Sequence, residues 1–438
     1  NHCFNSTTSN CGGGNRNAST AYEQGSGSTI MAYAGICGSD DLQPHSDPYF
    51  NFVSFDEIVN YSTVGSGNGC AVVTSTGNTA PTVSAGPNYT IPQNTPFTLT
   101  ASGSDPNGDP LTYCWEERDL GASTTVTAPD NGSSPLFRSW NPTVSPSRTF
   151  PRLQNLLNNT LPIGEVMPTT TRTLNFRVTA RDNRAGGGGV NTADMQVNVT
   201  AAAGPFVITS HNSGGTFFGL QTVTWNVAGT TNAPVSAANV NILLSTNGGQ
   251  TFPIVLSANT PNDGSQTVVF PDLSNNVARL QIEAVGNIFF DLVNSNFTVQ
   301  PAPSPMPLVG WDSTALVAEN CALANNAIDP GETVTVNVAL RNTGSGNTTN
   351  LTATLLVTNG VTLPSGPQIY GQLVAGGAAV TQAFSFTATG SCGGALTAVL
   401  QLQDGASNLG TVTRAFSLGS VVAATTQRTN STTIAIPA

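Results

Sequence analysis

The chain has 438 residues and a net charge of −11, and only 8% of its residues are charged, so Gly, Ser, Thr and Asn supply most of its polarity. All 13 basic residues are arginine, which excludes a lysine nucleophile, a P-loop lysine and, with the acidic balance, nucleic-acid binding. The length predicts three or four domains, and no apolar run approaches the roughly 18 residues that a transmembrane segment needs. The chain opens on Asn without a signal peptide, which we interpret as a processed, truncated or partly observed protein.

The first 75 residues differ from the rest of the chain. They contain a Gly-rich stretch at 11–15 and a predicted short helix at 53–61, where Ser54 is a candidate N-cap and Glu57 follows three residues later. After a connector rich in Pro, Gly and Thr at 77–87, the sequence shows no long helical period and reads as strands.

Three β-sandwich segments are expected in the rest of the chain, at 79–202, 205–300 and 308–420. The first of these alternates clearly in places, with Leu111, Tyr113 and Trp115 on one face and later Leu174, Phe176, Val178 and Ala180. A long excursion at 121–170, with one or two helical turns near 152–159, lies between the two sets. A Pro-rich spacer at 300–307 precedes the third, in which Val334, Val336, Val338 and Leu340 alternate with polar residues, as do Leu396, Ala398, Leu400 and Leu402. Residues 421–438 read as a linker and the first strand of a further module. The predicted fold class is therefore mostly β, a tandem of immunoglobulin-like sandwiches.

Seven cysteines lie at positions 3, 11, 37, 70, 114, 321 and 392. Their clustering without CxxC spacing predicts the disulfides of a secreted protein. We expect bridges between Cys11 and Cys37 and between Cys321 and Cys392, although the first four cysteines allow three connectivities. Cys114 is the cysteine left over.

The most specific motif is SGSTIMAYAGIC at 26–37, in which Met31 and Tyr33 lie in a tight turn between small residues. It resembles the Met-turn of metzincin zinc endopeptidases, and the CGGG…PYF stretch at 11–50 is similar to the reprolysin-like metallopeptidases of secreted bacterial proteins. The resemblance implies that residues 1–75 are the C-terminal part of a metzincin catalytic domain of α/β type. It implies that His2 is the third zinc ligand, that Met31 lies beneath the metal, and that Tyr33 approaches the metal or the oxyanion, as in some metzincin branches.

The resemblance extends more loosely to the trailing sandwiches, which look PKD-like at 79–202, Ig-like at 205–300 and CARDB-like at 308–420. The sequence departs from the family pattern in its catalytic part. The HExxH helix, which supplies two zinc ligands and the catalytic Glu, is absent from these residues, so this chain alone is expected to be inactive.

A calcium site is a second candidate. The string SDPNGDP places Asp105, Asn107 and Asp109 at alternate positions of a tight loop, an oxygen cluster that suits Ca²⁺, with the distant Asp182 as a further ligand. The alternative is a turn stabilised by its own Asx side chains and prolines, which is the more common use of such a sequence.

Two functions fit these observations. The first is part of a secreted zinc endopeptidase whose sandwiches hold it to a protein substrate, a cell surface or an extracellular polymer. The second is a non-catalytic structural or adhesive protein that self-associates through its sandwiches into a fibre or surface layer. Carbohydrate binding is a third possibility, with Trp140 and Trp311 as candidate surface platforms.

Overall fold

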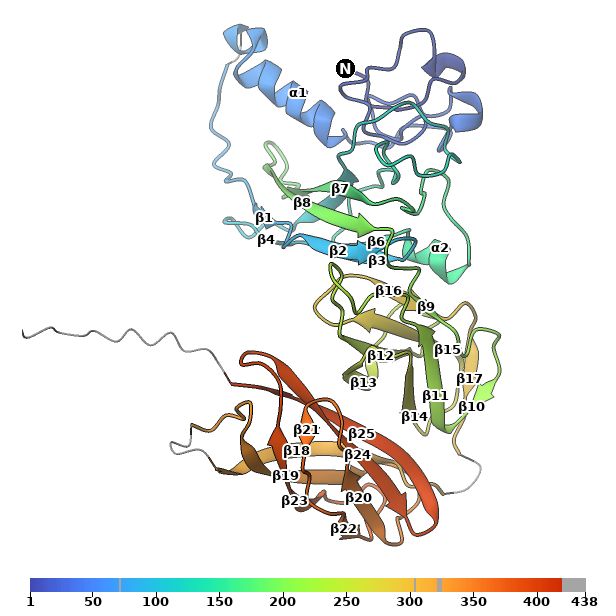
Figure 1. The fold of residues 1–438 in the computed structure, drawn as a ribbon. Helices are drawn as coiled ribbons and strands as arrows, with labels where there is room; N and C mark the ends of the chain where they lie inside the picture. Colours follow the sequence, from blue (N-terminus) through green and yellow to red (C-terminus); the bar gives the residue numbers. More distant parts are fainter. Residues whose placement is uncertain (71, 303–304, 321–324, 420–438) are drawn as a thin grey trace, which may run out of the picture. The chain divides into compact units, whose positions relative to one another are not determined.

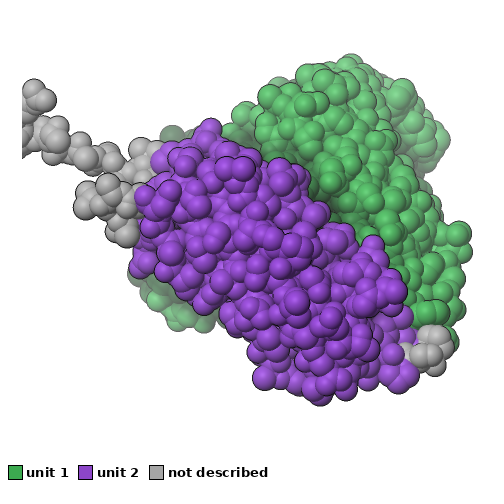
Figure 2. All heavy atoms as spheres, turned by 60° about the horizontal axis from the view of Figure 1, so that its bottom comes forward, with its two compact units in different colours: residues 1–301 green, residues 302–438 purple. Residues whose placement is uncertain are grey.

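The structure is a computed structural model that describes residues 1–70, 72–302, 305–320 and 325–419. It divides into two compact units, Asn1–Pro301 and Ala302–Ala438, coloured separately in Figure 2. The first unit contains the N-terminal segment and two sandwich segments, and the second contains one sandwich (Figure 1). The predicted fold class, mostly β with tandem sandwiches, is confirmed.

The N-terminal segment is largely irregular. Its helical elements are η1 (Ser9–Cys11), η2 (Gly38–Asp40), α1 (Phe52–Thr63) and η3 (Ser66–Cys70). The predicted helix exists, but Ser54 does not cap it: the side chain of Asn51 accepts the N–H of Val53, and α1 begins at Phe52. A carboxylate from the following sandwich, Glu116, accepts the N–H of Phe52 at 3.1 Å, so the start of α1 is set by a contact distant in sequence.

The second segment, residues 79–202, forms a four-stranded sheet in the order β2-β8-β7-β5 and the pairs β3-β6 and β1-β4. Its strands are β1 (Thr82–Ser84), β2 (Tyr89–Pro92), β3 (Phe97–Thr100), β4 (Ser102–Ser104), β5 (Thr112–Glu117), β6 (Ser147–Phe150), β7 (Arg172–Arg181) and β8 (Val190–Thr200). The alternating residues of β7 are fully buried as predicted, namely Leu174, Phe176, Val178 and Ala180. The excursion carries one short helix, α2 (Leu153–Leu157), where helical turns were expected.

The third segment, residues 205–300, packs a three-stranded sheet (β14-β11-β9) against a larger one in the order β10-β17-β15-β12-β13, with β16 paired to β15. Its strands are β9 (Val207–Ile208), β10 (Thr216–Phe217), β11 (Gly219–Asn226), β12 (Asn239–Ser245), β13 (Ile254–Pro261), β14 (Ser265–Phe270), β15 (Asn275–Ala284), β16 (Phe290–Leu292) and β17 (Phe297–Val299). Connections of one to twelve residues join these strands, which is why the segment reads as short strands with frequent turn signals.

The second and third segments share one hydrophobic core, although the sequence predicts separate domains. Phe97 of β3 forms an isolated bridge with Phe289, and the N–H of Thr98 donates to the carbonyl of Ile288 at 3.0 Å. Residues 288–290 therefore continue the small β3-β6 sheet across the boundary. The two sandwiches of the first unit are consequently one packed body rather than beads on a linker.

The second unit is a sandwich of two four-stranded sheets, β18-β19-β23-β21 and β22-β20-β24-β25. Its strands are β18 (Val309–Glu319), β19 (Thr333–Asn342), β20 (Leu351–Leu355), β21 (Val361–Thr362), β22 (Gln368–Gly371), β23 (Val380–Ala388), β24 (Ala395–Asp404) and β25 (Ser407–Ser417). The two alternating sets predicted from the sequence in β19 and β24 face the core, each residue at most 2% exposed.

Among the described residues, no helix has the length and apolar character to cross a membrane.

Candidate functional site

The turn that carries Met31 and Tyr33 is held by a buried carboxylate. Glu23 is 1% exposed, and its Oε1 accepts the backbone N–H groups of Ser28 and Thr29 at 2.9 and 3.2 Å. Its Oε2 accepts the Thr29 hydroxyl at 2.6 Å and the Cys3 thiol at 2.7 Å. Because a buried carboxylate needs several donors to offset its desolvation, this network fixes the turn. Sequence reasoning missed Glu23, and the only available signal was an isolated acidic residue before a Gly/Ser-rich turn.

His2 lies directly against this turn. Its Nδ1 is 3.3 Å from the carbonyl oxygen of Met31, and its Nε2 is 3.1 Å from the hydroxyl of Tyr33. A carbonyl only accepts, so Nδ1 carries the hydrogen and the lone pair is on Nε2. A histidine that binds a metal through one nitrogen commonly donates from the other to a carbonyl. His2 makes the carbonyl contact, while its Nε2 accepts the Tyr33 hydroxyl. The structure thus brings together the three residues that the resemblance singled out.

An open cavity of about 590 Å³ lies beside His2 and Met31. Its other walls are Asn1 and residues 14–18, which begin at the end of the Gly-rich stretch. A catalytic zinc needs three protein ligands and an open position. Among the described residues no other histidine lies at this cavity, since His45 is in an exposed loop and His211 is in the third segment among aromatic rings. The described residues therefore offer one candidate zinc ligand at this cavity and do not complete a zinc site.

Among the cysteines, the predicted bridge between Cys11 and Cys37 is present and joins the Gly-rich stretch to the end of the turn. Cys3, Cys70 and Cys114 are thiols, so the N-terminal cluster forms one bridge rather than two. Burial raises the pKa of the Cys114 thiol, which packs inside the second segment as an inert core residue. The expected bridge to Cys321 falls outside the described residues.

The N-terminal segment and the long excursion of the second segment are interlocked. Arg16 donates to the carbonyl of Gly121 at 2.7 Å, and Arg138 donates to the carbonyl of Leu42 at 3.2 Å. Between them, Glu116 accepts the Asn51 amide at 2.7 Å and the Ser139 hydroxyl at 3.0 Å. Burial, and secondarily the nearby Glu23, raises the pKa of Glu116 to about 7. The excursion is therefore a clamp on the N-terminal segment rather than a free loop insertion.

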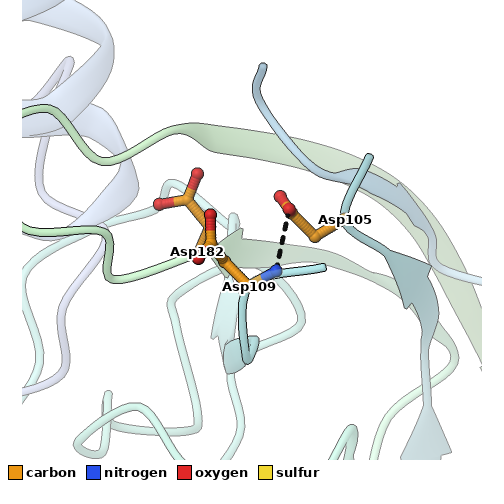
Figure 3. A group of neighbouring side chains, drawn as sticks. All are labelled: Asp105, Asp109 and Asp182. Atoms are coloured by element: carbon orange, nitrogen blue, oxygen red, sulfur yellow. Dashed lines mark hydrogen bonds between the residues drawn. The ribbon is translucent and has the colours of Figure 1, made fainter. Parts of the chain in front are cut away.

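A second cluster forms at the calcium candidate. The carboxylates of Asp105, Asp109 and Asp182 each place an oxygen within 4.8 Å of the others (Figure 3). Asp105 Oδ1 accepts the N–H groups of Asn107 and Asp109 at 2.8 and 3.0 Å, which curls the loop. The side chain of Asn107 does not join the cluster, because its oxygen accepts the N–H of Thr79 at 2.8 Å.

Two oxygens of the carboxylate cluster are unusual. Oδ2 of Asp105 and Oδ2 of Asp109 are inaccessible to solvent and accept no hydrogen bond. The nearest described cation is Arg184, whose Nη1 is 3.6 Å from Asp109 Oδ2. Hydrogen bonds from Asn78 and from backbone N–H groups lower the pKa of Asp182, which keeps that carboxylate ionised. Three clustered carboxylates with orphaned oxygens fit a hard divalent cation.

The two proposed tryptophan platforms have different surroundings. The indole ring of Trp140 lies between the guanidinium groups of Arg138 and Arg152, at 4.1 and 4.5 Å from its centroid, and its Nε1 donates to Glu165 at 2.7 Å. Trp140 is therefore covered by its own chain. Trp311 lies in β18 and donates to the Thr314 hydroxyl at 2.7 Å.

No protein-family model and no curated protein matches the sequence. Solved structures with some similarity include dimeric latent PorU from Porphyromonas gingivalis, with 9% identity and a TM-score of 0.22 over 76% of this chain. They also include a chimeric titin Z1Z2, with 12% identity and a TM-score of 0.17 over 51% of this chain and 99% of that one. The chicken CNTN1 FN1–FN3 domains have 10% identity and a TM-score of 0.14 over 75% of this chain and 95% of theirs. This chain spans 32% of the PorU chain. At these scores the similarities carry no argument about function, and the class that the structure itself defines is a tandem β-sandwich protein.

Proposed function

We propose that this chain is a fragment of a secreted zinc metalloendopeptidase, in which His2 is one zinc ligand and the sandwiches attach the enzyme to a surface or substrate. The observation that carries the proposal is the position of His2, with Nδ1–H on the Met31 carbonyl and the Nε2 lone pair beside the Tyr33 hydroxyl. The bridge between Cys11 and Cys37 supports an oxidising, extracellular location.

The residues at this site have separate roles in the proposal. In the proposal, the metal takes the place at His2 Nε2 that the Tyr33 hydroxyl occupies here, the Met31 carbonyl fixes the tautomer of His2, and Glu23 holds the turn. The displaced Tyr33 hydroxyl would lie next to the metal and donate a hydrogen bond where negative charge develops on a substrate carbonyl. With a single described ligand, this chain on its own is expected to leave peptides uncleaved.

The test is the intact mass of the natural protein together with its zinc content. The proposal expects a mass above 44.9 kDa, from a chain that carries the missing ligands, and about one zinc per chain. In that protein, His2→Ala is expected to abolish zinc retention, while His45→Ala, an exposed loop histidine, is the matched control and keeps it. A protein of 44.9 kDa without zinc, or zinc that survives the His2 substitution, would overturn the proposal.

A calcium ion at Asp105, Asp109 and Asp182 is a second proposal. It is supported by the convergence of the three carboxylates and by their two orphaned oxygens. The ion would join the loop at 105–109 to the end of β7 and stiffen the sandwich next to the connector. Calcium titration monitored by amide chemical shifts tests it. A response confined to these segments supports the site, and no response at millimolar calcium contradicts it.

The alternative function is a non-catalytic extracellular protein that assembles through its sandwiches. Two observations in the second unit disfavour open-ended strand pairing. The edge strand β18 contains two register shifts, and β25, an edge strand of the other sheet, carries the exposed Arg414. Bulges and charged side chains on edge strands disfavour pairing with another chain. Sedimentation velocity at protein concentrations from 1 to 100 µM tests this alternative. A series of oligomers that grows with concentration would favour assembly through the sandwiches.

A further inference from the structure

A cleft of about 410 Å³ lies between the second and third segments, within the first unit. One wall is Tyr89 of β2, Leu99 of β3 and Met195 of β8, and the opposite wall includes Gln281 and Glu283 of β15. We call it the inter-sandwich cleft. Its volume lies in the range of small-molecule sites, which form preferentially at domain boundaries.

The walls of this cleft are fixed relative to each other. The N–H of Phe290 donates to the carbonyl of Pro96 at 3.0 Å, and the Asn287 amide donates to the carbonyl of Thr90 at 2.9 Å. The shared core continues beneath them through Phe97 and Phe289, which are both fully buried. The cleft is thus preformed, so a ligand does not have to offset the cost of ordering it.

The polar wall is built to accept hydrogen bonds. Oε1 of Glu283 accepts the Asn241 amide at 3.0 Å, and Oε2 accepts the Gln281 amide at 3.2 Å. These two bonds hold the carboxylate in one orientation, and each oxygen retains a further lone pair. The opposite wall is mixed: it includes the half-buried ring of Tyr89, which packs against the core, and the hydroxyl-bearing Thr98 and Thr100.

The charges that line the cleft indicate which chemical class of ligand it can bind. The chain has no lysine, and no arginine is among the residues that line the cleft, so an anionic ligand would meet Glu283 without a counter-charge. A purely apolar ligand would leave the remaining lone pairs of the Glu283 carboxylate unpaired and remove them from water. A neutral molecule with one apolar face and several hydroxyl donors satisfies both walls.

We propose that the inter-sandwich cleft binds a neutral saccharide unit of a polymeric glycan. The apolar face of the sugar ring packs on Tyr89, and its hydroxyl groups donate to Glu283. This proposal rests on the attachment role of the sandwiches in the proposed function and names the chemistry of what they attach to. It places the sugar site in the cleft rather than on the two tryptophans favoured by the sequence.

Isothermal titration of the full chain with four soluble neutral hexasaccharides, of β-1,4-linked glucose, N-acetylglucosamine, xylose and mannose, tests the proposal. At least one is expected to bind at a single site. Glu283→Gln keeps the shape of the cleft and is expected to weaken binding about tenfold through loss of a charge-assisted hydrogen bond. Tyr89→Leu is expected to weaken it by at least as much.

The matched control is Tyr61→Leu, which removes an exposed tyrosine of α1 far from the cleft lining and is expected to leave binding unchanged. Thermal melting of each variant reports whether it folds. The proposal is overturned if none of the hexasaccharides binds, if the Glu283 and Tyr89 variants bind as the wild type does, or if hexalysine binds at the cleft in their place. Mass and zinc content are independent readouts, so the zinc proposal and the saccharide proposal fail separately.

Discussion

Glu116 makes the attachment of the N-terminal segment depend on pH. Its carboxylate is fully buried, caps the start of α1 from strand β5, and has a pKa raised from its ordinary 4.5 to about 7 by desolvation first and by Glu23 second. Because the folded state holds the proton more tightly than the unfolded state, stability is greatest below pH 4.5 and is lost as the pH rises towards and through 7.

The magnitude follows from linkage. At about 1.4 kcal/mol per pKa unit, the stability lost through Glu116, relative to a pH well below 4.5, is about 1.4 kcal/mol at pH 5.5 and about 3.4 kcal/mol at pH 8.5. The difference, about 2 kcal/mol, corresponds to about 30-fold in the equilibrium for releasing α1 from β5. Glu116→Gln removes this dependence. The new side-chain amide N–H points at a group that donates to Glu116 in the wild type. This mismatch is expected to lower the stability by about 1–3 kcal/mol at every pH.

Hydrogen exchange of the amides in α1 provides the assay, because comparing both proteins at the same pH cancels the intrinsic exchange rate. The ratio of the wild-type rate to the Glu116→Gln rate is expected to rise about 30-fold from pH 5.5 to pH 8.5. Asp263→Asn, an exposed carboxylate in the third segment, is the control and should give a constant ratio. A Glu116→Gln ratio that changes less than threefold would refute the argument that this carboxylate is buried and protonated in the folded protein.

Three further predictions concern stability. Replacing Cys11 and Cys37 by serine opens a bridge across 26 residues and is expected to destabilise the N-terminal segment by about 3–4 kcal/mol; urea titration read by exchange at residues 26–33 measures this, and an unchanged midpoint contradicts it. Calcium at millimolar concentration is expected to raise the melting temperature of the wild type by several degrees and that of Asp109→Asn by less than one degree; equal shifts would place the ion elsewhere. Phe97→Ala is expected to cost about 3–5 kcal/mol and to reduce exchange protection in both sandwiches of the first unit together, because Phe97 is fully buried in their shared core; loss confined to the second segment would contradict that single core.

The sequence was informative wherever a local period decides the structure. Alternation in β7, β19 and β24 correctly predicted which side chains are buried, because successive side chains of a strand point to opposite faces. The helix at 53–61 was also found, but its cap was misplaced. Asn51 and Glu116 determine where α1 starts, and Glu116 is 64 residues from the amide that it accepts.

The candidate sites differ in how many of their residues are close together in the sequence. The motif with Met31 and Tyr33 is contiguous, and a family resemblance linked it to His2, so all three residues were named from the sequence. Asp182 was named only as a possible partner of the loop at 105–109, and the structure brings it there while turning Asn107 away. Glu23 and the inter-sandwich cleft were not anticipated, since nothing local distinguishes a carboxylate that later becomes buried.

By itself, the sequence determined the mostly β class, the strand periodicity, the absence of lysine and the residues of the turn at 26–37. These properties follow from composition and from interactions between residues a few positions apart. Only the tertiary structure decided that two sandwiches share one core, that the excursion clamps the N-terminal segment, and that Tyr89 and Glu283 line one cleft. Burial and close approach between residues far apart in the chain depend on how whole sheets pack, and a local pattern does not contain that information.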